Sequence, residues 1–470
     1  MSHTLTALAT LPPGVAETAE VIARLDHCFF TGFGRMSERE VAAVSALPRL
    51  LAATPLGPRV KEAVDALLRS EFVEKHFATL ACARAALQGA MADSLSAQAS
   101  TALGRTPNLG EPSLSTPESP GHHGVFRESA RHFLMEIALT GFGQLEPESL
   151  YPFYATLDKI QEEPALIRLS AILSGFLSEL LSALPIPTGK TVPTYRWVDL
   201  WSRAMLLSLS VQPAAKIETV SGELLPLGCD LHHHRNLFSV CLHGLLRVGS
   251  DVRYVRTTVS AYKVDTVIAH EMWRLLEGSY DKLLKGIRDC AMIKLTDMQM
   301  LGTGDLLWDE SRAALGPSYS PFDIAESFLA PSAKLTRPSL SGLDRHPAQL
   351  AELFFLRDFK TVKIESHKSK RGSAAELVEE QALEVSGTKL PLSGARLSDS
   401  SGMTMERIAK ASALVGLLRF DRGRWSVQPL AIKIGSQVEL AGVPPQSLKS
   451  KDDTVAVLRE RAGKLLRKKS

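Results

Sequence analysis

The chain has 470 residues, of which 45% are hydrophobic and 22% charged, with a formal net charge of +3. This length suffices for roughly two to four domains, and the near balance of charge excludes a protein that attracts nucleic acid or membranes through its overall charge. Five cysteines without a C-x-x-C pair, behind an N-terminus that lacks a signal-peptide pattern, predict a cytoplasmic protein without a disulfide framework.

The first half of the chain contains an internal repeat. The tetrapeptide TGFG at residues 31–34 returns at 140–143, and apolar positions keep matching at the same offset for about forty residues. Apolar spacing predicts a helix before each tetrapeptide, over 17–30 and 126–139, and the glycines suit a helix end. Ser37 and Glu40 form the pattern of a capping box that opens the next helix, and Pro147 suits the first helical turn in the second copy. We therefore predict helical repeat copies at residues 1–100 and 125–212.

Two features of this half concern its partners and its linker. Residues 101–124, rich in Pro, Gly, Ser and Thr, predict a flexible linker between the copies. Residues 195–207 predict an amphipathic helix with Trp197 and Trp201 on its apolar stripe. Paired tryptophans can anchor a protein partner, and packing in the core is the alternative that we favour.

The second half changes to a strand pattern. Alternation and β-branched residues predict a small antiparallel β module at 213–268, with four or five strands and turns at Ser221-Gly222, Arg235-Asn236 and Gly249-Ser250. Residues 269–345 are predicted to be a helical segment, and 346–470 a mixed α+β C-terminal domain with a helix at 346–357 and a basic tail. The fold class expected for the whole chain is α+β multidomain.

The stretch CDLHHHRNLFSVCLH at residues 229–243 concentrates histidine and cysteine. If Arg235-Asn236 is a two-residue turn, paired residues have numbers that sum to 471, and period-two alternation puts the polar side chains on one face. Imidazole, thiolate and carboxylate groups are ligands that zinc accepts, although a turn of odd length would separate them. The candidate metal ligands are Asp230, His232, His234, Cys241 and His243. The alternative is a solvated hairpin face without metal.

The next strand and the C-terminus suggest nucleic acid. Aromatic and basic residues alternate along 252–263, as they do on barrels that bind single strands. The candidate contacts are Arg253, Tyr254, Arg256 and Tyr262. The sequence LRERAGKLLRKKS adds a basic tail, which can also dock on an acidic protein surface.

No complete catalytic motif is present. Thr188-Gly189-Lys190-Thr191 lacks the upstream glycine of a phosphate-binding loop, and Arg274 stands where H-E-x-x-H after His270 needs its second histidine. We therefore expect a non-catalytic scaffold or accessory subunit that has one or more protein partners, no cofactor and no membrane contact. The alternatives are a nucleic-acid-binding protein that uses the β module and tail, and a zinc-dependent hydrolase at the 229–243 hairpin.

Overall fold

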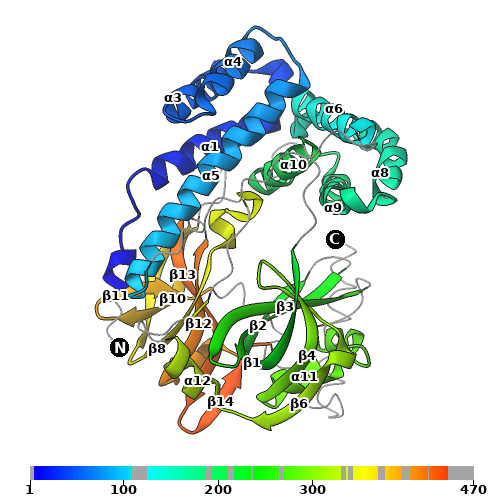
Figure 1. Cartoon of the computed structure of the whole chain (residues 1–470). Coiled ribbons are helices and arrows are strands. Elements are labelled where there is room, and N and C mark those ends of the chain that lie inside the picture. The colour runs from blue at the N-terminus through cyan, green and yellow to red at the C-terminus, as the bar shows by residue number, and fades with distance from the viewer. Residues whose placement is uncertain are drawn as a thin grey trace, which may run out of the picture.

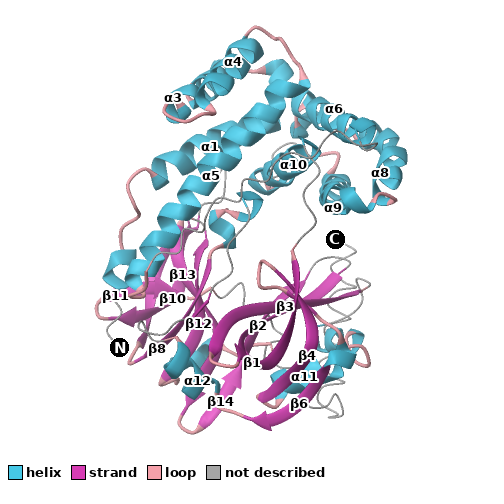
Figure 2. Cartoon of the chain, in the orientation of Figure 1, coloured by secondary structure: helices cyan, strands magenta, loops and turns pink. Residues whose placement is uncertain are grey.

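The computed structural model describes residues 5–106, 124–186, 192–209, 216–233, 237–263, 269–329, 335–336, 342–368, 376–393, 403–421 and 423–442. Helices form the N-terminal part and mainly antiparallel sheets form the rest, so the chain is broadly α+β as predicted (Figures 1 and 2). The predicted linker falls almost entirely, and the basic tail entirely, outside the described residues.

The first helical unit comprises residues 5–102. Its elements are η1 (Leu5–Leu8), α1 (Val15–Thr31), η2 (Phe33–Arg35), α2 (Glu38–Ser45), α3 (Leu47–Leu51), α4 (Gly57–Leu68) and α5 (Glu74–Ala102). The predicted capping box of Ser37 and Glu40 is present at the start of α2. The predicted first helix matches α1.

The second helical unit comprises residues 124–209. Its elements are α6 (Gly124–Thr140), η3 (Phe142–Gln144), α7 (Pro147–Leu150), η4 (Tyr151–Phe153), α8 (Tyr154–Gln161), η5 (Pro164–Leu166), α9 (Ile167–Ala183) and α10 (Thr194–Leu209). Pro147 occupies the first turn of α7, as predicted. Among the described helices, the run Pro164–Ala183 is long and apolar enough to cross a membrane by length and composition, which is weak evidence for a span. Several of its side chains are buried in the helical core, including Leu173, Phe176 and Leu177.

The two TGFG turns have the same geometry and pack against each other. Gly32 and Gly141 end α1 and α6 with φ of 96° and 84°, and each backbone N–H donates to the carbonyl four residues earlier. A Cβ on Gly32 would lie 2.7 Å from the Leu139 carbonyl oxygen, and one on Gly141 would lie 2.7 Å from the Gly32 Cα. Only glycine fits at both positions, because the φ is positive and the other turn's backbone occupies the space.

A seven-stranded sheet follows the helical units. Its strands are β1 (Ile217–His233), β2 (Leu237–Val248), β3 (Asp251–Tyr262), β4 (Ala291–Leu301), β5 (Leu306–Leu307), β6 (Ala313–Ser318) and β7 (Leu335–Thr336). The order is β5-β4-β1-β2-β3-β7, and β6 also pairs with β4. The helices η6 (Ala269–Leu275) and α11 (Asp281–Arg288) contribute Trp273 and Leu283 to the core on one face of this sheet.

Three predictions for this region are wrong. The Ser221-Gly222 signal marks a β-bulge inside β1, so the module at 213–268 has three long strands in its described part instead of four or five. The predicted helical segment 269–345 contains β4, whose Ile293 and Leu295 alternate inward. The inward–outward alternation of β4 then shifts at Asp297, whose φ is 53°, and that irregularity obscures the period-two pattern in the sequence.

The C-terminal part adds two more sheets. One has the order β14-β13-β12-β8, with β8 (Ala351–Arg357), β12 (Ala413–Asp421), β13 (Arg424–Ile434) and β14 (Gln437–Leu440). The other is β9 (Lys360–Lys368), β10 (Glu376–Val385) and β11 (Thr388–Pro391). The shorter elements are η7 (Glu310–Arg312), α12 (Pro321–Phe328), η8 (Gly342–Asp344), η9 (Pro347–Gln349) and α13 (Met405–Ala409). The helix predicted at 346–357 is wrong, because its apolar run LFFL is the buried centre of strand β8.

The core of the helical part continues into the C-terminal part of the chain, where Phe354 and Leu414 belong to the same cluster. The long helix α5 extends from the helical end of the molecule to the C-terminal sheet (Figure 1). Near its C-terminus, the Gln98 Oε1 accepts a hydrogen bond of 2.8 Å from the Trp425 indole N–H. The two large sheets meet at a second irregularity of β1, between Pro226 and Gly228, where a Cβ on Gly228 would lie 2.9 Å from the Leu430 carbonyl carbon. Residues of the helical part and of the C-terminal part therefore pack in one hydrophobic cluster.

Candidate functional site

The 229–243 hairpin has the register that a two-residue turn requires. Asp230 pairs with Cys241 and His232 pairs with Ser239, while the turn residues and His234 lie outside the described part. Asp230, His232, Cys241 and His243 therefore share one face, and Leu231, Val240 and Leu242 enter the core on the other. The predicted shared face is correct for the four described candidates.

These four side chains do not assemble a metal site. Within the described ranges, no group of three or more His, Cys, Asp and Glu side chains is placed to hold a metal ion. The buried Asp230 carboxylate instead accepts a hydrogen bond of 3.0 Å from the Arg419 guanidinium of β12 and lies 3.3 Å from His232 Nε2. Burial opposes ionisation of Asp230, but His232 and Arg419 overcome it and lower its pKa. The Asp230 carboxylate, which a metal would need as a ligand, is thus already bound by the Arg419 guanidinium.

The remaining polar groups on this face are locked in the interior. His243 Nδ1 lies 2.6 Å from the Tyr254 hydroxyl, and the two rings are stacked. Burial, together with the nearby Arg419, lowers the pKa of His243 to about 3, so its imidazole is neutral at physiological pH. Burial raises the pKa of the Cys241 thiol. Burial thus keeps the His243 imidazole neutral and disfavours ionisation of the Cys241 thiol.

The candidate nucleic-acid face is not presented to solvent as a unit. Tyr254 is buried, Arg256 forms an ion pair of 2.9 Å with Asp305, and Arg253 forms one of 3.0 Å with Glu218. Tyr262 alone of the four candidates is largely exposed, at 87%. Side chains alternate along β3 as predicted, but the face that carries Tyr254 packs toward the second large sheet, as the contact of Asp230 with β12 demonstrates.

The two candidate anchor tryptophans are core residues. Trp197 and Trp201 are 1% and 0% exposed on α10. Trp201 donates its indole N–H to the Leu134 carbonyl at 2.7 Å, and Trp197 packs edge-on against Phe142. Neither tryptophan is available to a partner, and both pack in the core, as the favoured alternative predicted.

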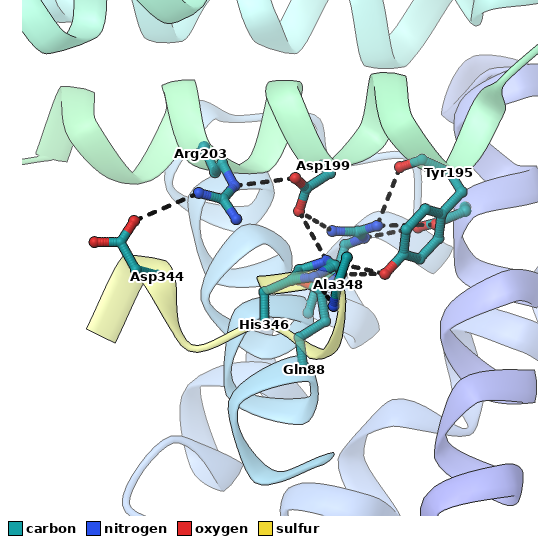
Figure 3. A network of polar contacts seen from close by, with 9 residues as sticks. Gln88, Tyr195, Asp199, Arg203, Asp344, His346 and Ala348 are labelled. Carbon is teal, nitrogen blue, oxygen red and sulfur yellow. Dashed lines mark hydrogen bonds and ion pairs between the residues drawn. The ribbon is translucent and has the colours of Figure 1, made fainter. Parts of the chain in front are cut away.

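A buried polar network that the sequence analysis missed joins both helical units to the segment before β8 (Figure 3). Arg84 of α5 is fully buried and donates two hydrogen bonds, of 2.8 and 3.0 Å, to the Asp26 carboxylate of α1. A third donor of Arg84 reaches Asp199 of α10 at 3.3 Å. His346, which precedes η9, places its Nε2 3.3 Å from the same Asp199 carboxylate and 2.9 Å from the Tyr195 hydroxyl.

This network is built for position and not for proton transfer. His346 Nδ1 accepts a hydrogen bond of 3.0 Å from the Ala348 backbone N–H, and its Nε2 is surrounded by Asp199 at 3.3 Å and by the Tyr195 hydroxyl and the Gln88 amide nitrogen at 2.9 Å each. A general base needs a lone pair that is free toward a substrate, and here both ring nitrogens have protein partners. Burial opposes ionisation of Asp199, but the hydrogen bond from His346 overcomes it and lowers the Asp199 pKa. The network therefore fixes the helical units on the β part.

The cysteines supply no nucleophile either. All five are free, and burial raises the pKa of each thiol, to about 12 for Cys28. A reactive cysteine needs a lowered pKa, because the thiolate is the attacking form.

An open groove runs along α6 of the second helical unit. Its volume is about 620 Å³, and its walls come from α6, the N-terminus of α5 and the turn from η3 to α8. The residues that line it are Glu74, Val125, Glu128, Ser129, His132, Phe133, Glu136, Ile137, Thr140, Leu145, Ser149, Leu150, Pro152, Phe153 and Thr156. Phe133 and Phe153 stack in parallel at 3.9 Å and provide an apolar wall. We call this feature the α6 groove.

The α6 groove carries negative charge. His132 lies 3.4 Å from Glu74 and 3.8 Å from Glu136, and Arg131 lies 3.5 Å from Glu74. Glu128 is exposed and forms no ion pair with the residues that the structure describes. The groove thus combines an apolar wall with carboxylates that are exposed or only weakly paired.

In the first helical unit, the buried Glu40 side chain joins α2 to α1. Glu40, 109 residues before Ser149, is 4% exposed, and its carboxylate lies 3.0 Å from His27 Nδ1 on α1. It also accepts hydrogen bonds from the Ser37 backbone at 3.0 Å and from the Thr31 hydroxyl at 3.3 Å. The residues 109 positions after Glu40 and His27 are Ser149 and Glu136, so this carboxylate–imidazole pair is absent from the second unit. The repeat offset was thus a signal that could have located the groove.

No protein-family model matches this chain, and a search of curated proteins finds no relative. The proposed function therefore rests on the geometry of this structure alone.

Proposed function

We propose that this chain is a non-catalytic scaffold or accessory subunit, and that its α6 groove binds a cationic, amphipathic helix of a protein partner. The observation that carries the proposal is the combination of an open groove along a 17-residue helix with exposed carboxylates and an apolar wall. Helix-in-groove recognition uses an apolar stripe for affinity and charge complementarity for specificity. No cofactor is needed for this role.

The groove dimensions fit a helical occupant. A helix of 17 residues is about 25 Å long, which is enough for about four helical turns of a partner to lie beside α6. Apolar residues at helical spacing would contact Phe133 and Phe153, while Lys or Arg on the flanks would approach Glu128 and Glu136.

We also propose that the helical part is a duplication whose two units have diverged. The shared turn geometry at Gly32 and Gly141 and their reciprocal packing support this reading. The first unit is closed by Glu40 and the second is open, so one copy stabilises the molecule while the other binds. A cytoplasmic location belongs to the same proposal and is supported by five free cysteines.

A binding assay with a synthetic probe tests the proposed function. The probe is a fluorescent helix of about 17 residues with leucine at helical spacing and lysine elsewhere, matched to the length of α6. We expect salt-sensitive binding to the full chain, weakened about tenfold or more by Glu128→Lys/Glu136→Lys. The matched control is Asp158→Lys/Glu162→Lys, which makes the same charge change at exposed positions of the second unit outside the groove.

A second variant closes the groove without adding positive charge at Glu128. Ser149→Glu/Glu136→His recreates the pair that Glu40 and His27 form in the first unit. We expect it to abolish probe binding while the circular dichroism of the helices is unchanged. Equal loss in the Asp158→Lys/Glu162→Lys control, or full binding by both groove variants, would rule the groove out as the binding site.

A further inference from the structure

The chain itself contains a segment with the chemistry that the α6 groove selects. In residues 458–470, six Lys and Arg accompany a single Glu. Val455, Leu458, Ala462 and Leu465 follow one another at helical spacing, so the sequence pattern predicts one apolar stripe with basic flanks. We call residues 455–470 the C-terminal basic segment. It lies outside the described residues.

We propose that the α6 groove of one copy binds the C-terminal basic segment of a second copy. This inference rests on the proposed function of the groove and names its occupant. The carboxylates of Glu128 and Glu136 complement the basic flanks, and the stacked Phe133 and Phe153 complement the apolar stripe.

The described part of the chain ends on a different part of the molecule from the α6 groove. Figure 1 shows β14, which ends at Leu440, at the end of the molecule opposite to α6 and α8. A contact between different surfaces of two copies is heterologous, so each copy offers one groove and one segment. Such contacts extend with concentration unless a rotation closes them into a ring.

Sedimentation velocity of the full chain over a concentration series tests the proposal. We expect self-association that weakens with added salt and that Glu128→Lys/Glu136→Lys weakens about tenfold or more. Arg461→Gln/Lys464→Gln/Lys468→Gln, which removes three of the six cations of the segment, should have the same effect. The Asp158→Lys/Glu162→Lys variant should associate as the wild type does.

Mixing the two defective variants gives the decisive measurement. The groove variant keeps an intact segment and the segment variant keeps an intact groove, so together they can form one productive contact. We expect each variant alone to be a monomer and the mixture to form a 1:1 dimer. A wild-type monomer at all concentrations, or a mixture that stays monomeric, overturns the inference. If the leucine–lysine probe still binds the wild-type groove in that case, the proposed function stands and only the occupant is wrong.

Discussion

Replacement of Arg84 by methionine tests whether the buried network holds the helical units together. Arg84 is fully buried and is the cation that contacts both the Asp26 and Asp199 carboxylates. Methionine fills a similar apolar volume but leaves Asp26 with a buried, uncompensated charge. Asp199 keeps partners in Arg203 and His346, so most of the loss should come from Asp26.

The expected loss of stability is large. Removal of one partner from a buried ion pair costs about 3–5 kcal/mol, because the other charge remains desolvated. For a folding unit of the size of the helical part, that loss corresponds to a fall in the unfolding midpoint of roughly 10 °C. The double variant Arg84→Met/Asp26→Leu should recover most of it, since an apolar pair in the same space has no charge to desolvate.

The loss should also depend on pH in a defined direction. Burial raises the pKa of Asp26, and the Arg84 guanidinium works against that effect. Without Arg84 the pKa of Asp26 rises further, so the folded protein binds a proton that the unfolded chain has released. A raised carboxyl pKa gives stability that is present at low pH and lost as pH rises through the folded pKa. Arg84→Met should therefore be less destabilised at about pH 5 than at about pH 8.

Thermal unfolding followed by circular dichroism measures these effects. The control is Arg69→Met, which removes an exposed ion pair with Glu71 in the same helical unit and should change the midpoint little. If Arg84→Met unfolds at the wild-type midpoint, or if its loss is larger at pH 5 than at pH 8, the charge argument is wrong.

Two further predictions concern the turn and the capping box. Gly141→Ala should destabilise the protein by about 2 kcal/mol or more, because its Cβ would lie 2.7 Å from the Gly32 Cα at a positive φ. The control is Gly175→Ala in α9, whose Cβ meets no atom within 4 Å, so this variant should be neutral or stabilising. Thermal unfolding midpoints compare the two variants, and equal midpoints would contradict the packing argument. Burial opposes ionisation of Glu40, but hydrogen bonds from Ser37 overcome it and lower its pKa to about 2. That stability is present above the ordinary pKa of glutamate and is lost as pH falls toward 2, so Glu40→Gln should remove part of the acid sensitivity seen in urea unfolding, and parallel pH curves would count against it.

The sequence predicted those elements that depend only on residues close together along the chain. The helices before the TGFG turns, the capping box of Ser37 and the hairpin register around Asp230 follow from spacing and turn residues alone. The strand β4 and the strand β8 were predicted as helices, because a bulge interrupts the alternation of the first and burial on both faces removes it from the second.

The candidate sites failed where long-range contacts decide what a side chain meets. Sequence spacing put Asp230, Cys241 and His243 on one face, but it could not reveal that Arg419, from a strand 189 residues later, would pair with that carboxylate. The same limit applies to Arg84 and Asp26, which are 58 residues apart on different helices. A lone charge on a helix gives no sign of a distant partner.

Divergence between the two helical units offers the more general reading of this molecule. The glycine turns that join the units share the sequence TGFG and have φ of 96° and 84°, and a Cβ at either glycine would clash with the other turn. The space between the first two helices of each unit is under no such constraint. One glutamate, Glu40, closes it with hydrogen bonds in the first unit, and a serine at the matching position leaves it open in the second. On the proposed function and the proposed duplication, the binding surface arises by loss of a single filling side chain, because the turns and the network around Arg84 hold the rest of the fold.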